Sequence, residues 1–158
     1  MLKDPLRNLV RAWLLTAVVD GTFSGVLAQF FYGSTAVRLF QGVAATLLGK
    51  EALNGGAETA LIGLGMHFGV ALAWSIVFLV LAMRSPRLRR EIATTGGVMR
   101  VAAMYGPVIW MVMSLVVIPA LTHRPPNITY KWWIQFLGHI PFVAVPIVSQ
   151  IARGVRNS

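Results

Sequence analysis

The sequence predicts an all-α integral membrane protein, a four-helix bundle that forms a single domain over residues 1–158. Of its residues, 56% are hydrophobic and 12% are charged, whereas ordinary soluble domains carry about 25% charged residues. Four stretches are long enough to cross a hydrocarbon core about 30 Å thick, which takes roughly 20 helical residues. They are continuously apolar rather than alternating, so helices and not barrel strands are expected. The predicted spans are 12–32, 59–83, 99–121 and 132–151.

Positive charge is distributed unevenly between the two sides of these spans. Four basic residues fall on one side, and the other side carries ten: Lys3, Arg7, Arg11, Arg84, Arg87, Arg89, Arg90, Arg100, Arg153 and Arg156. Because cytoplasmic loops are enriched in Lys and Arg, both termini are predicted to be cytoplasmic, in a bacterial inner membrane. The net charge of +9 is interpreted as a solvated rim beside anionic lipid headgroups, so no nucleic-acid partner is expected.

The first predicted span, 12–32, contains a carboxylate where lipid-facing helices have none. Thr16, Asp20 and Ser24 recur at four-residue intervals, with Gly21 and Gly25 beside them. Residues four apart share one helix face, and small residues allow close helix approach. Intramembrane acids are costly and usually face the bundle interior, where they find a partner. This face is therefore predicted to point inward.

A short amphipathic helix over about 35–49 is predicted between the first two spans. Its apolar residues repeat at helical spacing, and Gly49 offers a stop. Arg38, Gln41 and Lys50 occupy the opposite side. We expect this helix to lie at the outer membrane interface, with its apolar side in lipid or over the bundle.

The later spans supply two histidines as possible partners for Asp20. His67 shares a face of the second span with Gly63, and Gly65 with Gly69 forms a further pair predicted to pack closely. In the fourth span, Gln135 and His139 lie on nearly one stripe. Counting at about 1.5 Å per residue places both histidines roughly 10 to 12 Å below the outer boundary, with Asp20 nearer the midplane.

The predicted spans also contain prolines in their interior and aromatic residues at their ends. Pro107, Pro141 and Pro146 each leave a carbonyl unpaired, so they either bend the helices or line a small polar cavity near His139. Tyr32, Trp132 and Trp133 lie at span ends. They are predicted to anchor the helices at the membrane interface.

Three chemistries fit Asp20, His67 and His139. A proton relay would use the acid and a histidine as successive acceptors. A haem would take His67 and His139 as axial ligands, with Gly65, Gly69 and Gly138 leaving room for the macrocycle. A metal ion would take all three side chains. The alternative is a structural hydrogen-bonding cluster that fixes helix packing.

The chain resembles a group of small, uncharacterised bacterial inner-membrane proteins with four spans. The resemblance rests on Asp20-Gly21, on His139 and on four further motifs: Arg38-Leu39-Phe40-Gln41, Leu47-Leu48-Gly49, Gly55-Gly56 and Gly63-Leu64-Gly65-Met66-His67-Phe68. It implies the four-span topology and the pairing of an intramembrane acid with two histidines, but no reaction.

Taken together, these observations favour an accessory or assembly subunit of a larger membrane complex. The sequence shows no serine nucleophile, phosphate loop or paired carboxylates, so an enzyme is not expected. The expected partners are the lipid bilayer and other membrane subunits or a second copy of the chain. Transport of protons, ions or small solutes through the Asp/His centre is the first alternative, and a bis-histidine haem carrier is the second.

Overall fold

The computed structural model describes residues 2–156, which are helical and contain no strand. Four helices in this part of the chain are long and apolar enough to cross a membrane: Pro5–Phe31, Gly56–Arg84, Thr95–Thr122 and Tyr130–Arg156. The prediction of an all-helical protein with four candidate membrane-spanning helices is confirmed.

Three of these four helices consist of consecutive elements. The first comprises α1 (Pro5–Val26) and η1 (Leu27–Phe31), and the second is α3 (Gly56–Arg84) alone. The third and fourth are composed as follows: α5 (Thr95–Val112), η3 (Met113–Val117) and α6 (Ile118–Thr122), then α7 (Tyr130–His139), η4 (Ile140–Ala144) and α8 (Val145–Arg156). Each of the four helices is longer than the corresponding predicted span (12–32, 59–83, 99–121 and 132–151), because hydropathy marks only the lipid-soluble part of a helix.

Shorter elements join the spans, and each begins at a capping side chain or a turn. Thr35 accepts a hydrogen bond from Arg38 N at the start of α2 (Ala36–Leu48), which leads into η2 (Lys50–Asn54). Ser85 caps α4 (Pro86–Ile92) in the same way, and Thr94 caps α5. These oxygens satisfy backbone N–H groups that have no partner within the helix.

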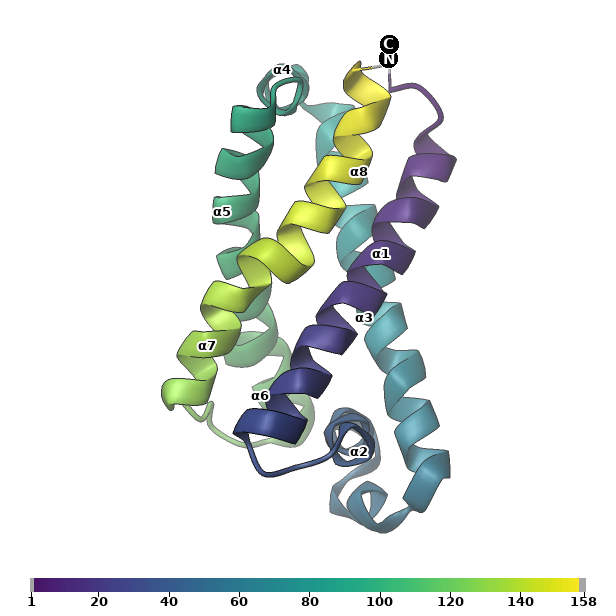
Figure 1. Ribbon diagram of the computed structural model, residues 1–158, viewed down its shortest axis with the longest axis vertical. Coiled ribbons are helices and arrows are strands. Elements are labelled where there is room, and N and C mark those ends of the chain that lie inside the picture. Colours follow the sequence, from purple (N-terminus) through teal and green to yellow (C-terminus); the bar gives the residue numbers. More distant parts are fainter. Residues whose placement is uncertain (1, 157–158) are drawn as a thin grey trace.

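Figure 1 shows α1 and α8 side by side, with α5 on the far side of α8 and α3 packed against α1. Both ends of the chain lie beside α4 at one end of the bundle, whereas α2 lies at the other end. We call the half that contains α4 and the chain ends the basic half. The half that contains α2, η1, α6 and α7 is called the α2 half.

The apolar core is concentrated in the basic half. Phe78 of α3 is 1% exposed and packs against Tyr105 of α5, with ring centroids 5.0 Å apart. Further core residues come from four helices, and they include Ala12, Ile92, Ala102, Ile109, Ile147, Val148 and Ile151. Burying these side chains holds α1, α3, α5 and α8 together at this end.

On the polar side of helix α2, Gln41 faces the protein, whereas Arg38 is exposed. Gln41 is buried, and its Nε2 donates to Gly56 O at 2.9 Å. Arg38 donates to Leu53 O in η2. A buried amide must find a partner, and here the loop carbonyls supply it. Val37 and Leu47 remain exposed on the apolar side.

Widened π turns interrupt three of the spanning helices, at η1, η3 and η4. Pro141 lies within η4, and Pro119 lies two residues after the end of η3. A proline removes a backbone donor and pushes the preceding turn apart, which accounts for these two positions. Pro107 lies inside α5 without such a turn. No proline lies within η1 or next to it.

Candidate functional site

Asp20 and His67 meet inside the α2 half, on α1 and α3. His67 Nδ1 lies 3.9 Å from Asp20 Oδ2, and the two side chains are 15% and 16% exposed. Across the same helix contact, His67 Nε2 lies 2.9 Å from Ala17 O. The Phe40 ring of α2 packs edge-on against the imidazole from a third direction. The centre is therefore formed where α1, α2 and α3 converge.

The hydrogen bond to Ala17 determines how protons are placed on the His67 ring. A carbonyl only accepts, so His67 Nε2 must carry a proton and donate it. In a neutral imidazole Nδ1 then has no proton and faces Asp20 as an acceptor. At 3.9 Å, Nδ1 and Oδ2 lie beyond hydrogen-bond distance, so Asp20 and His67 are close neighbours without a direct hydrogen bond.

Two buried oxygens of this centre have no hydrogen-bond partner among residues 2–156. They are Asp20 Oδ1 and Thr16 Oγ1. Thr16 lies one helical turn before Asp20, on the face where the sequence predicts both residues. Buried polar groups are nearly always satisfied by protein or water, so these two unpartnered oxygens on one stripe are candidates for binding water or an ion.

His139 lies on the far side of the centre and is held by its own helix. Its Nδ1 donates to Gln135 O at 2.7 Å, and its ring packs against Trp110 at a centroid distance of 4.8 Å. Among residues 2–156, no hydrogen bond, ion pair or ring contact joins His139 to Asp20 or His67, so the three side chains do not form one group. Gln135 contributes its carbonyl oxygen to the hydrogen bond with His139. Ser24, also predicted for the polar cluster, is partly buried on α1.

The contacts bear in part on the metal and haem alternatives. Among residues 2–156, no three His, Asp or Glu side chains come together as a group that could hold a metal ion. At Gly138, one of the glycines expected to leave room for a haem, an added Cβ would lie 2.5 Å from the Phe23 ring. Phe23 is itself stacked on Phe142 at 4.1 Å. Phe23 therefore fills the space beside Gly138, and both alternatives stay predictions.

The glycines that bring helices together are mostly different from the predicted ones. A Cβ on Gly63 would lie 1.8 Å from Phe40 O, so this glycine allows α2 to cross α3. Gly106 serves the same purpose where α5 meets the backbone of His139. Gly65 and Gly69, the pair predicted to pack closely, meet no other residue within 4 Å of an added Cβ, so the prediction that they support helix packing stays open.

Gly21 and Gly25, the other two glycines predicted to support packing, lie on the inner side of α1. A Cβ on Gly21 would lie 3.3 Å from His67 Nε2, so a larger residue here would press on the imidazole. A Cβ on Gly25 would reach the Ala36 side chain at 4.0 Å, an ordinary contact distance. Gly21 therefore matters most for the Asp20 and His67 centre.

The aromatic residues at the span ends divide between surface and interior. Trp133 is exposed, whereas Trp132 is buried and its Nε1 donates to Ser114 Oγ at 3.0 Å. Trp132 therefore joins two spans instead of facing outward. Lys131 Nζ lies 4.5 Å above the Tyr32 ring. Burial and the neighbouring Tyr130 raise the pKa of Tyr32, so its phenol stays protonated at neutral pH.

Sequence patterns did not reveal two hydrogen bonds between spans. Trp13 Nε1 donates to Phe68 O, and Tyr105 Oη donates to Trp74 O, each at 2.8 Å. Both hydrogen bonds are accepted by main-chain carbonyls. Every residue carries such a carbonyl, so the sequence could not show which one would be the acceptor.

Comparison with known proteins assigns no family to this arrangement. The sequence matches no protein-family model, no curated protein and no solved structure.

Proposed function

We propose that the protein is an accessory or assembly subunit of a larger membrane complex, and that a partner's transmembrane helix packs on the outer face of α3. The observation that carries this proposal is the outward position of Gly65 and Gly69, where an added Cβ would meet nothing within 4 Å. Ala73, one turn further, is also exposed. Small residues at four-residue spacing let two helix backbones approach closely in lipid. As proposed, the protein is not an enzyme.

The partner is expected to be a helix of another membrane protein. The segments between the candidate spans are 32–55, 85–94 and 123–129, and their only long helix is α2. None of these segments is long enough to form a separate soluble domain that could bind a partner. Leu61 and Val70 are exposed beside the glycines and would pack around an incoming helix.

Affinity purification in mild detergent tests this proposal directly. The Gly65→Ile, Gly69→Ile double variant should lose a stoichiometric membrane partner that the natural chain retains. Ala103→Ile, at an exposed position of α5, adds similar bulk elsewhere and should retain it. The proposal fails if the glycine variant keeps its partner. Capture of only a second copy of this chain would instead assign α3 to a homo-oligomer.

We further propose that the protein lies in a bacterial inner membrane with both chain ends in the cytoplasm. Ten Lys and Arg residues flank one side of the four spans and four flank the other, which supports this orientation. Because the chain has no cysteine, single-cysteine variants can be labelled without background. In intact spheroplasts an impermeant maleimide should label Lys131→Cys and leave Arg87→Cys unlabelled. The reverse pattern would refute the orientation.

Proton or ion handling at Asp20 is the second candidate function. It is favoured by the unpartnered Asp20 Oδ1 and by the position of His67 Nδ1 3.9 Å from Asp20 Oδ2. In proteoliposomes, Asp20→Asn should abolish a proton or cation flux that the natural chain supports. Thr22→Val changes an exposed residue of the same helix and should leave the flux intact. Equal flux through both variants would exclude this candidate.

A further inference from the structure

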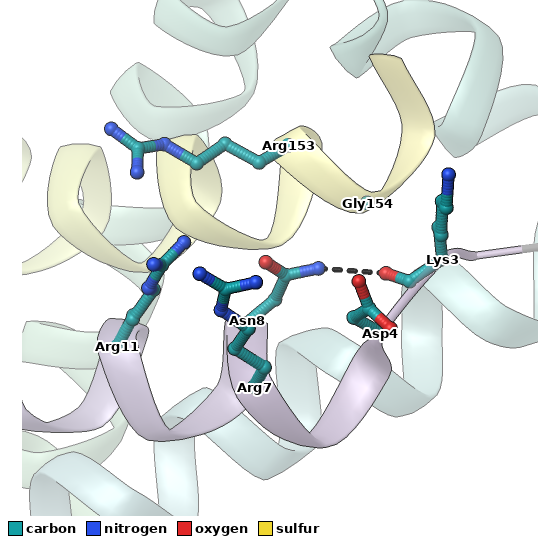
Figure 2. A pocket seen from close by; sticks show the side chains of 7 residues that line it. All are labelled: Lys3, Asp4, Arg7, Asn8, Arg11, Arg153 and Gly154. Carbon is teal, nitrogen blue, oxygen red and sulfur yellow. Dashed lines mark hydrogen bonds between the residues drawn. The ribbon is translucent and has the colours of Figure 1, made fainter. Parts of the chain in front are cut away.

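Four cations surround a hollow at the basic end of the bundle. The hollow has a volume of about 310 Å³, and Lys3, Arg7, Arg11 and Arg153 line it. Figure 2 shows Arg7 and Arg11 rising from α1 and Arg153 reaching along α8 above them. Two different helices therefore contribute positive charge to one space.

The positive charge around this hollow is not balanced by the protein. Within residues 2–156, none of the four cations forms an ion pair within 4.0 Å, and Asp4 supplies the single carboxylate of the lining. Like charges gathered at a membrane surface repel one another, and an anion between them removes that repulsion. The arrangement is suited to a ligand with more than one negatively charged oxygen.

The floor of the hollow is held rigid by hydrogen bonds. Lys3 N donates to Gly154 O at 2.9 Å, and Asn8 Nδ2 donates to Lys3 O at 2.8 Å. A Cβ on Gly154 would lie 2.7 Å from both Asn8 Nδ2 and Lys3 O, so only glycine allows this contact. The start of the chain is thus fixed against α8, with Lys3 at one side of the hollow.

We propose that this hollow binds a phosphate group, held mainly by Arg7, Arg11 and Arg153. Guanidinium groups bind phosphate oxygens through paired, charge-assisted hydrogen bonds. The site lies at an end of the candidate spanning helices, where phospholipid headgroups are found, and basic pockets between helices can hold anionic headgroups. The same chemistry would also accept a soluble phosphate. This binding does not depend on the partner surface of α3.

Native mass spectrometry tests the site on the whole protein released from nanodiscs of phosphatidylcholine and phosphatidylglycerol in equal amounts. The natural chain should retain one phosphatidylglycerol in preference to phosphatidylcholine. With each arginine worth about 1 kcal/mol near the surface, Arg11→Gln with Arg153→Gln should reduce this retention by at least about tenfold. Both arginines are exposed, so the fold should survive the exchange.

The matched control and a competing anion complete the test. Arg87→Gln with Arg90→Gln removes the same charge from α4 at the same end and should leave retention unchanged. Displacement of the lipid by inorganic phosphate would identify a soluble phosphate as the ligand, whereas retention in its presence would identify the headgroup. Equal loss in both double variants, or no loss in either, would overturn the proposal.

Discussion

The two halves of the molecule are stabilised in different ways. In the basic half, α1, α3, α5 and α8 meet around apolar side chains such as Phe78, Ile109 and Ile147. In the α2 half, helices α1, α3 and α7 carry the polar residues Asp20, His67 and His139, and two buried oxygens there lack a partner among residues 2–156. The difference indicates that the basic half provides stability. In the α2 half, burying polar groups without partners costs stability, and this cost suggests that these groups serve a function.

The largest effect should come from emptying the apolar core. Phe78→Ala removes a ring that is 1% exposed and should lower the free energy of unfolding by about 3–5 kcal/mol. Unfolding in mixed detergent micelles measures it. Val80→Ala, on the exposed side of the same helix, is the control. A similar loss in both variants would mean that this half is not stabilised by core packing.

A smaller loss is expected where α2 crosses α3. Gly63→Ala places a methyl group against Phe40 O and should lower the free energy of unfolding by about 1–3 kcal/mol. Gly65→Ala adds the same group in open space and should be neutral or slightly stabilising, because alanine favours helix. The same unfolding experiment on both variants compares them. A larger cost at Gly65 would reverse the inner and outer faces assigned to α3.

Thr16→Val tests the α2 half, and here we expect the free energy of unfolding to rise instead of fall. The hydroxyl is buried without a protein partner, so its replacement by a methyl group should raise the free energy of unfolding by about 1 kcal/mol. Denaturation in the same micelles measures it. A loss of stability would show that Thr16 Oγ1 is bound to water or an ion, and would make the two halves more different still.

The smallest change concerns the bond between Trp132 and Ser114. Ser114→Ala removes the acceptor of Trp132 Nε1 and should lower stability by about 0.6 kcal/mol, the average for such bonds between membrane helices. Ser149→Ala is the control, because Ser149 bonds only within its own helix, to Pro146 O. If Ser114→Ala is indistinguishable from this control, Trp132 is held by packing alone.

The sequence predicted what depends on a helix's own residues. Continuous apolar runs predicted the four spanning helices, because a helix satisfies its own backbone in lipid. The four-residue spacing of Thr16 and Asp20 predicted a shared helix face, and both side chains lie on α1 one turn apart. Local spacing was sufficient for these features.

Features that depend on a neighbouring helix could not be predicted in this way. Gly63, Gly65 and Gly69 all lie within the same seven residues, and only the position of α2 determines that Gly63 is buried. The Gly56 carbonyl that accepts the hydrogen bond from Gln41 could not be predicted either, because every residue carries such a carbonyl. The basic hollow was interpreted as a rim of separate charges, because the approach of α8 to α1 at Gly154 is a property of the assembled bundle.

The contact between Lys3 and Gly154 has a consequence for how the protein is made. Helix α1 is synthesised before α8 and packs against it, so the bundle cannot close until α8 has been inserted. Ala17 and its partner His67 are separated by 50 residues. At about 5–20 residues per second, Asp20 reaches the membrane seconds before its histidine. During that interval Asp20 has no His67 beside it, so the insertion machinery and not the fold must keep the carboxylate out of the lipid.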